Sequence, residues 1–211
     1  MAYFFTSDEH IGHRNIIKLC KRPFDNLEHM EKELITRHNS RVSKGDMVFH
    51  LGDMFWRTYG YIPAQRYVEA LNGAHYYIYG NHEELFERHL SLRKLFDIYV
   101  ESHRVKVEDV GAGHGIHLSH FAHRVWPRSG GGSWHLYGHS HSELPEDLSL
   151  SFDIGVDAWD YYPVSLEEVK AKMYRKLEWW EYLDKVREQI DLGGPHEDSN
   201  TTEPPPSTGL C

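Results

Sequence analysis

Residues 3–13 read YFFTSDEHIGH, and this stretch decides the fold of the first half of the chain. Residues 3–6 form a short run of apolar and aromatic side chains, which is typical of a buried β-strand. The run stops at Ser7, and Asp8, Glu9 and His10 follow directly. Side chains two positions apart on an extended segment point the same way, so Asp8 and His10 can bind one ion. We therefore expect function at the end of this strand.

The same pattern occurs twice more along the chain. Residues 47–51 are mostly apolar and end at Gly52-Asp53, and residues 76–79 end at Gly80-Asn81-His82. Each run is short enough to be a strand, and each ends in side chains with oxygen or nitrogen donors. Neighbouring strand ends can collect these side chains around one spot.

Helices are expected between these strands, and further strands after them. Apolar residues recur at helical spacing over residues 27–42, and Pro63 marks the start of a second helix over residues 63–71. The second half carries β-branched and aromatic residues between Gly- and Pro-containing breaks, which predicts strands at residues 98–107, 114–119, 134–138 and 149–156. This order of elements indicates an α/β protein.

A final helix is predicted from Ser165 onward, because Ser165 and Glu168 fit a capping box. One apolar stripe follows in steps of three and four, and we interpret it as core: Leu166, Val169, Met173, Leu177, Trp180, Leu183, Val186 and Ile190. Residues 193–211 hold three acidic residues, four prolines and no Lys or Arg, so they cannot bury enough apolar surface to offset the entropy of ordering. We therefore expect one domain over residues 1–192 and a disordered acidic, proline-rich tail over residues 193–211.

Composition narrows the classes of protein further. The chain has 211 residues, of which 40% are hydrophobic and 26% charged, as in an ordinary globular protein. No window approaches the ~18 uninterrupted apolar residues of a membrane span, and acidic residues come too early for a signal peptide, so we expect a cytoplasmic protein without a membrane partner. The two cysteines, Cys20 and Cys211, are too few for a disulfide framework or a thiolate zinc site. The formal net charge of −9 disfavours a broad basic groove for nucleic acid.

The chain contains 17 histidines, and histidine is the commonest side-chain metal ligand. His120 follows a predicted strand, and His139 and His141 follow the next one, again two positions apart. His50 begins the turn before Asp53 and is interpreted as a core or supporting residue rather than a ligand. The remaining histidines match no motif and are assigned no role: His29, His38, His75, His89, His103, His114, His117, His135 and His196.

Taken in order, these motifs resemble the calcineurin-like metallophosphoesterase superfamily over roughly residues 2–165: Asp8-Glu9-His10, Gly52-Asp53, Gly80-Asn81-His82, His120 and Gly138-His139-Ser140-His141. Two segments are similar to a small bacterial and phage branch of that superfamily. The first is residues 7–17 with Arg22-Pro23-Phe24, and the second is Gly155-Val156-Asp157 followed by residues 162–167.

The resemblance implies a four-layer sandwich, in which two mixed β-sheets pack face to face with helices outside. It also implies two divalent metal ions that share Asp53. The first ion would take Asp8, His10, Asp53 and His141, and the second would take Asp53, Asn81, His120 and His139. Imidazole, carboxylate and amide donors suit manganese, iron, zinc, cobalt or nickel. His82 would stabilise the transition state or protonate the leaving oxygen, as the corresponding histidine does in the superfamily.

Several residues near these motifs are candidates to bind a phosphorylated substrate. His13 and Arg14 follow the first ligand pair, and residues 122–134 form a glycine-rich, cationic and aromatic segment between the His120 and His139 motifs. That segment is interpreted as a lid over the phosphate or a nucleobase, or alternatively as a solvated hairpin, and its candidate contacts are His123, Arg124, Trp126 and Arg128. Glu83 and Glu84 are interpreted as surface groups at a helix start.

The expected function is therefore hydrolysis of phosphoester bonds by in-line attack of a metal-bound hydroxide on phosphorus, with a small phosphodiester or nucleotide as substrate. Met54-Phe55-Trp56-Arg57 replaces the extension that the superfamily's protein phosphatases carry after Gly-Asp, which disfavours a phosphoprotein substrate. A metal-dependent nuclease and a phosphomonoesterase are alternative enzymes, although the acidic net charge disfavours binding of long nucleic acids. A binding scaffold on the same fold is the non-enzyme alternative.

Overall fold

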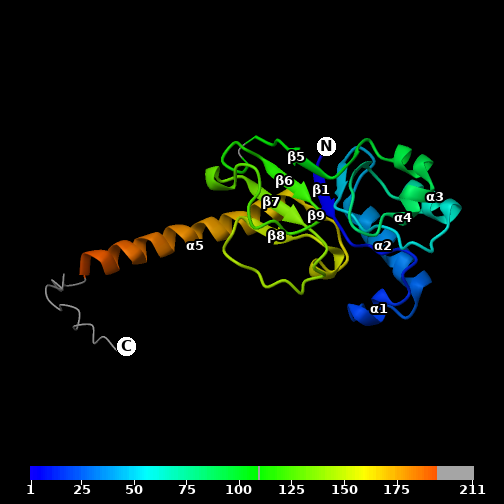
Figure 1. Cartoon of the computed structure of the whole chain (residues 1–211), viewed down its shortest axis with the longest axis horizontal. Helices are drawn as coiled ribbons and strands as arrows, with labels where there is room; N and C mark the ends of the chain where they lie inside the picture. The colour runs from blue at the N-terminus through cyan, green and yellow to red at the C-terminus, as the bar shows by residue number, and fades with distance from the viewer. Residues whose placement is uncertain (109, 194–211) are drawn as a thin grey trace, which may run out of the picture.

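A computed structural model describes residues 1–108 and 110–193 of the chain, with side chains described up to residue 188 (Figure 1). Gly193, the first residue of the tail expected over residues 193–211, is the last residue of the final helix. The rest of the tail lies outside the described residues, so that expectation stays a prediction.

The first sheet has the strand order β4-β3-β2-β1-β9. Its members are β1 (Tyr3–Thr6), β2 (Met47–His50), β3 (Ala74–Ile78), β4 (Tyr99–Val100) and β9 (Val164–Ser165). β1 to β4 pair in parallel and β9 pairs antiparallel to β1, so the sheet is mixed. Thr6 pairs with His50, and His50 pairs with Tyr77. The carboxyl ends of β1, β2 and β3 therefore lie at one edge of the sheet.

The second sheet has the order β5-β6-β7-β8. It consists of β5 (Ser102–Val105), β6 (Ile116–Ser119), β7 (Trp134–Tyr137) and β8 (Ser151–Asp153). β5 is antiparallel to β6, and the other pairs are parallel, so this sheet is also mixed. The strands expected in the second half are confirmed, although each is shorter than its sequence pattern.

Alternate residues of both sheets meet in a shared apolar core. Phe5 and Phe49 of the first sheet belong to the same buried cluster as Leu118, Trp134 and Leu136 of the second. Since successive strand residues point to opposite faces, the residues between them lie on the outer face of the second sheet. These outer residues include His117, Ser119 and His135.

Helices cover the outer face of the first sheet: α1 (Ile16–Leu19), α2 (Leu27–Arg41), α3 (Tyr61–Ala70), α4 (Glu84–Arg88) and the 3-10 helix η1 (Leu90–Leu95). Their apolar residues form a second buried cluster with Tyr77 of β3. The Asn26 side chain caps α2 by accepting a hydrogen bond from the His29 backbone N–H. Two further 3-10 helices, η2 (Ser129–Gly131) and η3 (Val156–Ala158), lie in the loops of the second half.

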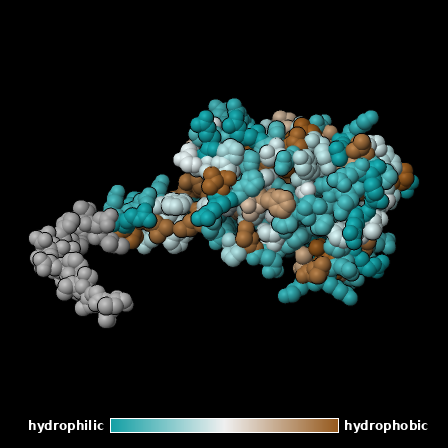
Figure 2. All heavy atoms as spheres, viewed as in Figure 1, coloured by the Kyte–Doolittle hydropathy of each residue, from teal (hydrophilic) through white to brown (hydrophobic). Residues whose placement is uncertain are grey.

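The last helix, α5 (Leu166–Gly193), begins at the predicted capping box. The Ser165 N–H donates to the Glu168 carboxylate, and the Glu168 N–H donates to Ser165 Oγ. Leu166, Val169 and Met173 are buried, but Trp180 is 42% exposed. Beyond that point the helix leaves the body of the protein, and hydrophobic side chains lie along its surface (Figures 1 and 2). The interpretation of the whole stripe as core is therefore wrong at Trp180, Leu183 and Val186, none of which is buried, and the side chain of Ile190 lies outside the described residues. Among the described residues, no helix combines the length and apolarity needed to cross a bilayer.

Candidate metal centre

The loops that leave the carboxyl ends of β1, β2, β3, β6 and β7 carry every predicted ligand, and the structure brings these residues together. They form two groups whose donor atoms lie within 4.8 Å of one another. One group contains Asp8, His10 and His141, and the other contains Asp53, His120 and His139. Asn81 joins the second group, since its Oδ1 lies 3.0 Å from His120 Nε2. This division is the one that the family resemblance implied.

Asp53 lies between the two groups. Its Oδ2 is 3.7 Å from His10 Nε2 and 3.6 Å from His120 Nε2. Its other oxygen, Oδ1, accepts hydrogen bonds from the backbone N–H groups of Asn81 at 3.0 Å and His82 at 2.9 Å. The backbone therefore holds one oxygen, and the second oxygen faces both groups, as a shared ligand requires.

The backbone at the centre adopts a conformation that is rare outside glycine. Positive φ angles occur at Asp8 (61°), His10 (52°), Asp53 (55°), His139 (67°) and His141 (46°). Left-handed backbone is costly for residues with a Cβ, and such strain gathers at functional sites. The loops thus hold these side chains in place at the expense of local backbone energy.

Two glycines make room for the carboxylates. A Cβ at Gly80 would collide with Asp53 Oδ1, and a Cβ at Gly138 would collide with Ser7 Oγ and Asp8 Oδ2. The absence of a side chain at these positions lets the loops after β3 and β7 approach the loops after β1 and β2 closely.

Four ligands of the centre are buried, and three of their polar atoms lack partners. Asp8, Asp53, His10 and His120 are each no more than 2% exposed. Burial, and then the nearby Asp53 carboxylate, raises the pKa of Asp8 well above its usual range. Burial, followed by the neighbouring His141 and Arg22, lowers the pKa of His10 to about 2. Among the described residues, Asp8 Oδ1 and both ring nitrogens of His10 have no hydrogen-bond partner.

Unpartnered buried polar atoms are costly, and a bound cation would satisfy them. Neutral imidazole nitrogens and a carboxylate oxygen are the donors that borderline divalent metals take. The residues of this centre therefore fit the two divalent ions that the sequence leads us to expect.

Neighbouring groups orient two of the histidines. His120 Nδ1 lies 2.6 Å from the Leu51 carbonyl, and His141 Nδ1 lies 2.7 Å from Asp157 Oδ2. Each acceptor requires a proton on Nδ1, which leaves Nε2 free as a donor atom for a metal. Burial alone would raise the pKa of Asp157, but hydrogen bonds from His141 and Arg22 outweigh it and hold that pKa below its usual range.

Sequence reasoning missed the supporting roles of Arg22 and Glu83. Arg22 donates to Asp157 and to the backbone carbonyls of Asp8 and Glu9. The only sequence signal was the Arg22-Pro23-Phe24 segment of the family resemblance.

The interpretation of Glu83 as a surface group is wrong. It is 8% exposed, and its Oε1 accepts from Gly80 N–H at 2.8 Å, Tyr77 OH at 3.0 Å and Asp53 N–H at 3.2 Å. Burial raises its pKa to about 7.

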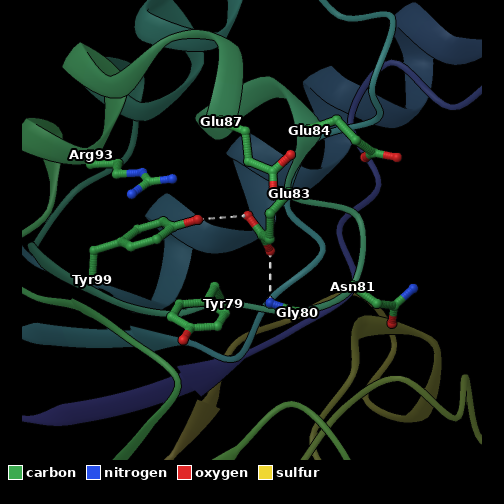
Figure 3. Close-up of a pocket in the computed structure, with 8 residues that line it drawn as sticks. All are labelled: Tyr79, Gly80, Asn81, Glu83, Glu84, Glu87, Arg93 and Tyr99. Atoms are coloured by element: carbon green, nitrogen blue, oxygen red, sulfur yellow. Dashed lines mark hydrogen bonds between the residues drawn. The ribbon is translucent and has the colours of Figure 1, made fainter.

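A cavity of about 490 Å³ lies beside Asn81 (Figure 3). Figure 3 shows the Glu83 carboxylate between the Gly80 backbone and the Tyr99 ring, and the Arg93 guanidinium stacks on that ring at 4.5 Å. Glu83 thus joins the wall of this cavity to the loops that hold Asn81 and Asp53.

His82 lies at the entrance of the centre. Its side chain is 32% exposed, and its Nε2 is 4.0 Å from Asp53 Oδ2. Its ring lies 4.9 Å from Trp56. Trp56 also stacks on His13, with ring centres 3.6 Å apart. The structure therefore brings His13 to the centre and identifies Trp56 as the residue that supports both histidines.

The other predicted substrate contacts differ in their surroundings. Arg14, Arg124 and Arg128 are exposed, and His123 packs against His117 and His135. Trp126 is only 6% exposed, because it stacks on His135 and donates its indole N–H to the Ser133 carbonyl. It therefore does not present the free ring that the expected substrate contact requires.

An exposed ring does lie at the centre, on a residue that the sequence did not single out. Phe121 is 47% exposed, and its ring centre is 4.6 Å from that of His139.

No protein-family model matches the chain. The chain is 29% identical over 185 residues to the uncharacterized protein MJ1445 of Methanocaldococcus jannaschii, a match that covers 82% of this chain and 95% of that protein. It is also 29% identical over 180 residues to the gene 66 protein of Mycobacterium phage L5, covering 74% and 86% respectively. A protein of unknown function from Aquifex aeolicus, AQ665, has a similar crystal structure, with a TM-score of 0.62 at 23% identity over 81% of this chain and 98% of that chain. That likeness shows the fold alone, and none of these names states an activity.

Proposed function

We propose that this protein is a two-metal phosphoesterase of the calcineurin-like type, which hydrolyses small phosphodiesters or nucleotides. The observation that carries the proposal is the position of Asp53, whose Oδ2 faces a histidine of each group at 3.6–3.7 Å while the backbone holds Oδ1. Paired sites that share one carboxylate are the arrangement that two-metal phosphoesterases use.

The chain's own residues would divide the binding of the ions. Asp8, His10 and His141 would hold one ion, Asn81, His120 and His139 would hold the other, and Asp53 would hold both. When bound, two divalent ions polarise a phosphoryl group and lower the pKa of a water molecule between them. With two carboxylates at the centre, about two positive charges would remain uncompensated and attract phosphate at short range, despite the net charge of −9.

His82 would act on the leaving group. Its partly exposed ring is next to Asp53, and it contacts Trp56 through the ring face rather than through a ring nitrogen. A histidine near neutrality can donate a proton to the leaving oxygen, or can stabilise charge that develops there.

The rest of the substrate would lie toward Phe121 rather than toward Trp126. The Phe121 ring is exposed and within 5.0 Å of His120, whereas the Trp126 ring is buried against His135. An exposed aromatic face beside a phosphate site can stack on a nucleobase or an aryl group.

A substrate screen of the metal-reconstituted protein tests this function. Catalytic efficiency is measured on aryl phosphodiesters, aryl phosphomonoesters, cyclic and linear dinucleotides, and single-stranded DNA, with Asp53→Asn as the control. We expect diesters or dinucleotides to be preferred and Asp53→Asn to be inactive. A tenfold preference for monoesters or DNA would replace the substrate class, and metal binding without any hydrolysis would favour a binding scaffold.

A further inference from the structure

Three histidines that are not among the ligands assigned above lie together on the outer face of the second sheet. They are His117 of β6, His135 of β7, and His123 in the loop that follows β6. Each offers a ring nitrogen, and these nitrogens lie within 4.8 Å of one another. The proposed phosphoesterase chemistry uses none of these nitrogens.

The fold builds this cluster through strand register. His117 and His135 are paired residues of the parallel strands β6 and β7, so their side chains stand next to each other on one face. The loop after β6 then places the His123 ring 5.5 Å from His117 and 5.2 Å from His135. Trp126 packs on His135 with ring centres 5.2 Å apart.

A buried nitrogen of this cluster has no partner. His117 is 6% exposed, and its Nε2 has no hydrogen-bond partner among the described residues. A buried polar atom without a partner is destabilising, and a bound cation would supply the partner that this nitrogen lacks.

The two buried histidines are in the form that binds metals. Burial, followed by the neighbouring His123, lowers the pKa of His117 to about 4, and burial with His117 lowers that of His135 to about 3. Both rings are therefore neutral near pH 7, as metal ligands must be.

His135 is also held in place from both sides. Its Nε2 lies 2.8 Å from Ser119 Oγ, and its Nδ1 lies 2.8 Å from Ser151 Oγ. Binding an ion through one ring nitrogen would replace one serine contact and leave the other to orient the ring. A histidine ligand commonly has such a partner on its second nitrogen.

We propose that His117, His123 and His135 form a third metal site, separate from the Asp53 centre, for a borderline divalent cation such as zinc. Three imidazoles without a carboxylate favour zinc, cobalt, nickel or copper over manganese or magnesium. Three histidines also leave a coordination position open in a tetrahedral zinc site. This site is additional to the proposed function and does not depend on it.

The open position would face a cavity that the two sites share. A cavity of about 470 Å³ is lined by His117 and His123 and also by His120 and Phe121, which belong to the Asp53 centre. Because three neutral imidazoles do not compensate the charge of the ion, an anionic group in this cavity would be attracted to it.

Counting zinc in the full-length protein tests the proposal. The chain is stripped with a chelator, reloaded with Zn²⁺, desalted, and its zinc content measured. We expect about three ions per chain in the wild type and about two in His123→Ala, whose exposed side chain can be removed without opening the core. His29→Ala, which removes a histidine from the surface of α2, should keep about three.

A second variant separates this site from the proposed function. Asp53→Asn combined with His10→Ala and His139→Ala removes the shared ligand and one further ligand of each ion, and this variant should still retain about one zinc ion that is lost when His123→Ala is added. A His123→Ala variant with the wild-type zinc content, or no loss of zinc when His123→Ala is added to the variant of the paired centre, would overturn the proposal. Because zinc content is measured without any substrate, failure of the hydrolysis assays would not affect this result.

Discussion

Arg22 and Asp157 are joined by two hydrogen bonds of 2.8 Å, from the Nε and Nη2 atoms of the guanidinium to the two carboxylate oxygens. The pair is buried and joins two segments that are 135 residues apart in the sequence. Arg22 also donates to the carbonyls of Asp8 and Glu9, and Asp157 accepts from His141. One ion pair thus supports the loop after β1 and the last histidine of the first metal group.

Arg22→Lys is expected to weaken metal binding. Lysine keeps the positive charge but cannot donate two parallel hydrogen bonds and reach both carbonyls, so Asp8 and His141 lose their orientation. Loss of such supporting contacts typically lowers metal affinity about 10–100-fold. Calorimetric titration with Mn²⁺ measures the affinity, and Arg41→Lys, at the half-exposed pair with Glu168, is the matched control. An Arg22→Lys affinity equal to that of the control would show that the pair does not support the centre.

His82→Ala is expected to lower turnover by about 10²–10⁴-fold without loss of metal, because the side chain acts on the leaving group and is not a ligand. Turnover on an aryl phosphodiester and metal content are measured on the same sample. The assigned role is wrong if the variant loses an ion or keeps full activity. A diester whose leaving group has a low pKa should be less sensitive to the substitution, because its departure needs little protonation.

Phe121→Ala is expected to raise KM for a dinucleotide about tenfold, because the exposed ring beside His139 would no longer stack on a base. Trp126→Ala should instead lower stability by about 3–5 kcal/mol, because it removes a buried ring from the surface of His135. Steady-state kinetics and thermal melting separate the two effects. If Trp126 contacts the substrate instead, Trp126→Ala would raise KM and Phe121→Ala would leave it unchanged.

The buried histidine His38 is expected to make the protein less stable in acid. Burial lowers its pKa from 6.5 to about 4, so between these values the unfolded chain binds a proton that the folded chain does not. This group therefore leaves the free energy of unfolding unchanged above pH 6.5 and lowers it as the pH falls toward 4, by an amount on the order of 3 kcal/mol.

His38→Gln removes this titration and keeps an N–H donor for the Asn72 carbonyl, which His38 Nε2 contacts at 2.8 Å. Chemical denaturation at pH 7 and pH 4.5 should show a smaller loss of stability in the variant than in the wild type. His29→Gln, with a side chain that is 39% exposed, serves as the control. An unchanged pH dependence in His38→Gln would contradict this account.

The strand ends were predictable because a short apolar run followed by a polar donor is a local pattern. Asp8, Asp53 and Asn81 stand at such ends, and parallel pairing brings those ends to one edge. The contact between His117 and His135 depends on the register of two strands that are distant in sequence, which no local pattern encodes. Likewise, a helical stripe shows which face of α5 is apolar but not where the body of the protein ends, so Trp180 was interpreted as core.

Anomalous diffraction from crystals of the Mn²⁺-loaded protein shows whether two ions share Asp53. We expect two peaks about 3.5–4 Å apart, with the Asp53 carboxylate between them. One peak should lie among Asp8, His10 and His141, and the other among Asn81, His120 and His139. A single peak, or peaks elsewhere while this centre stays empty, would contradict the account.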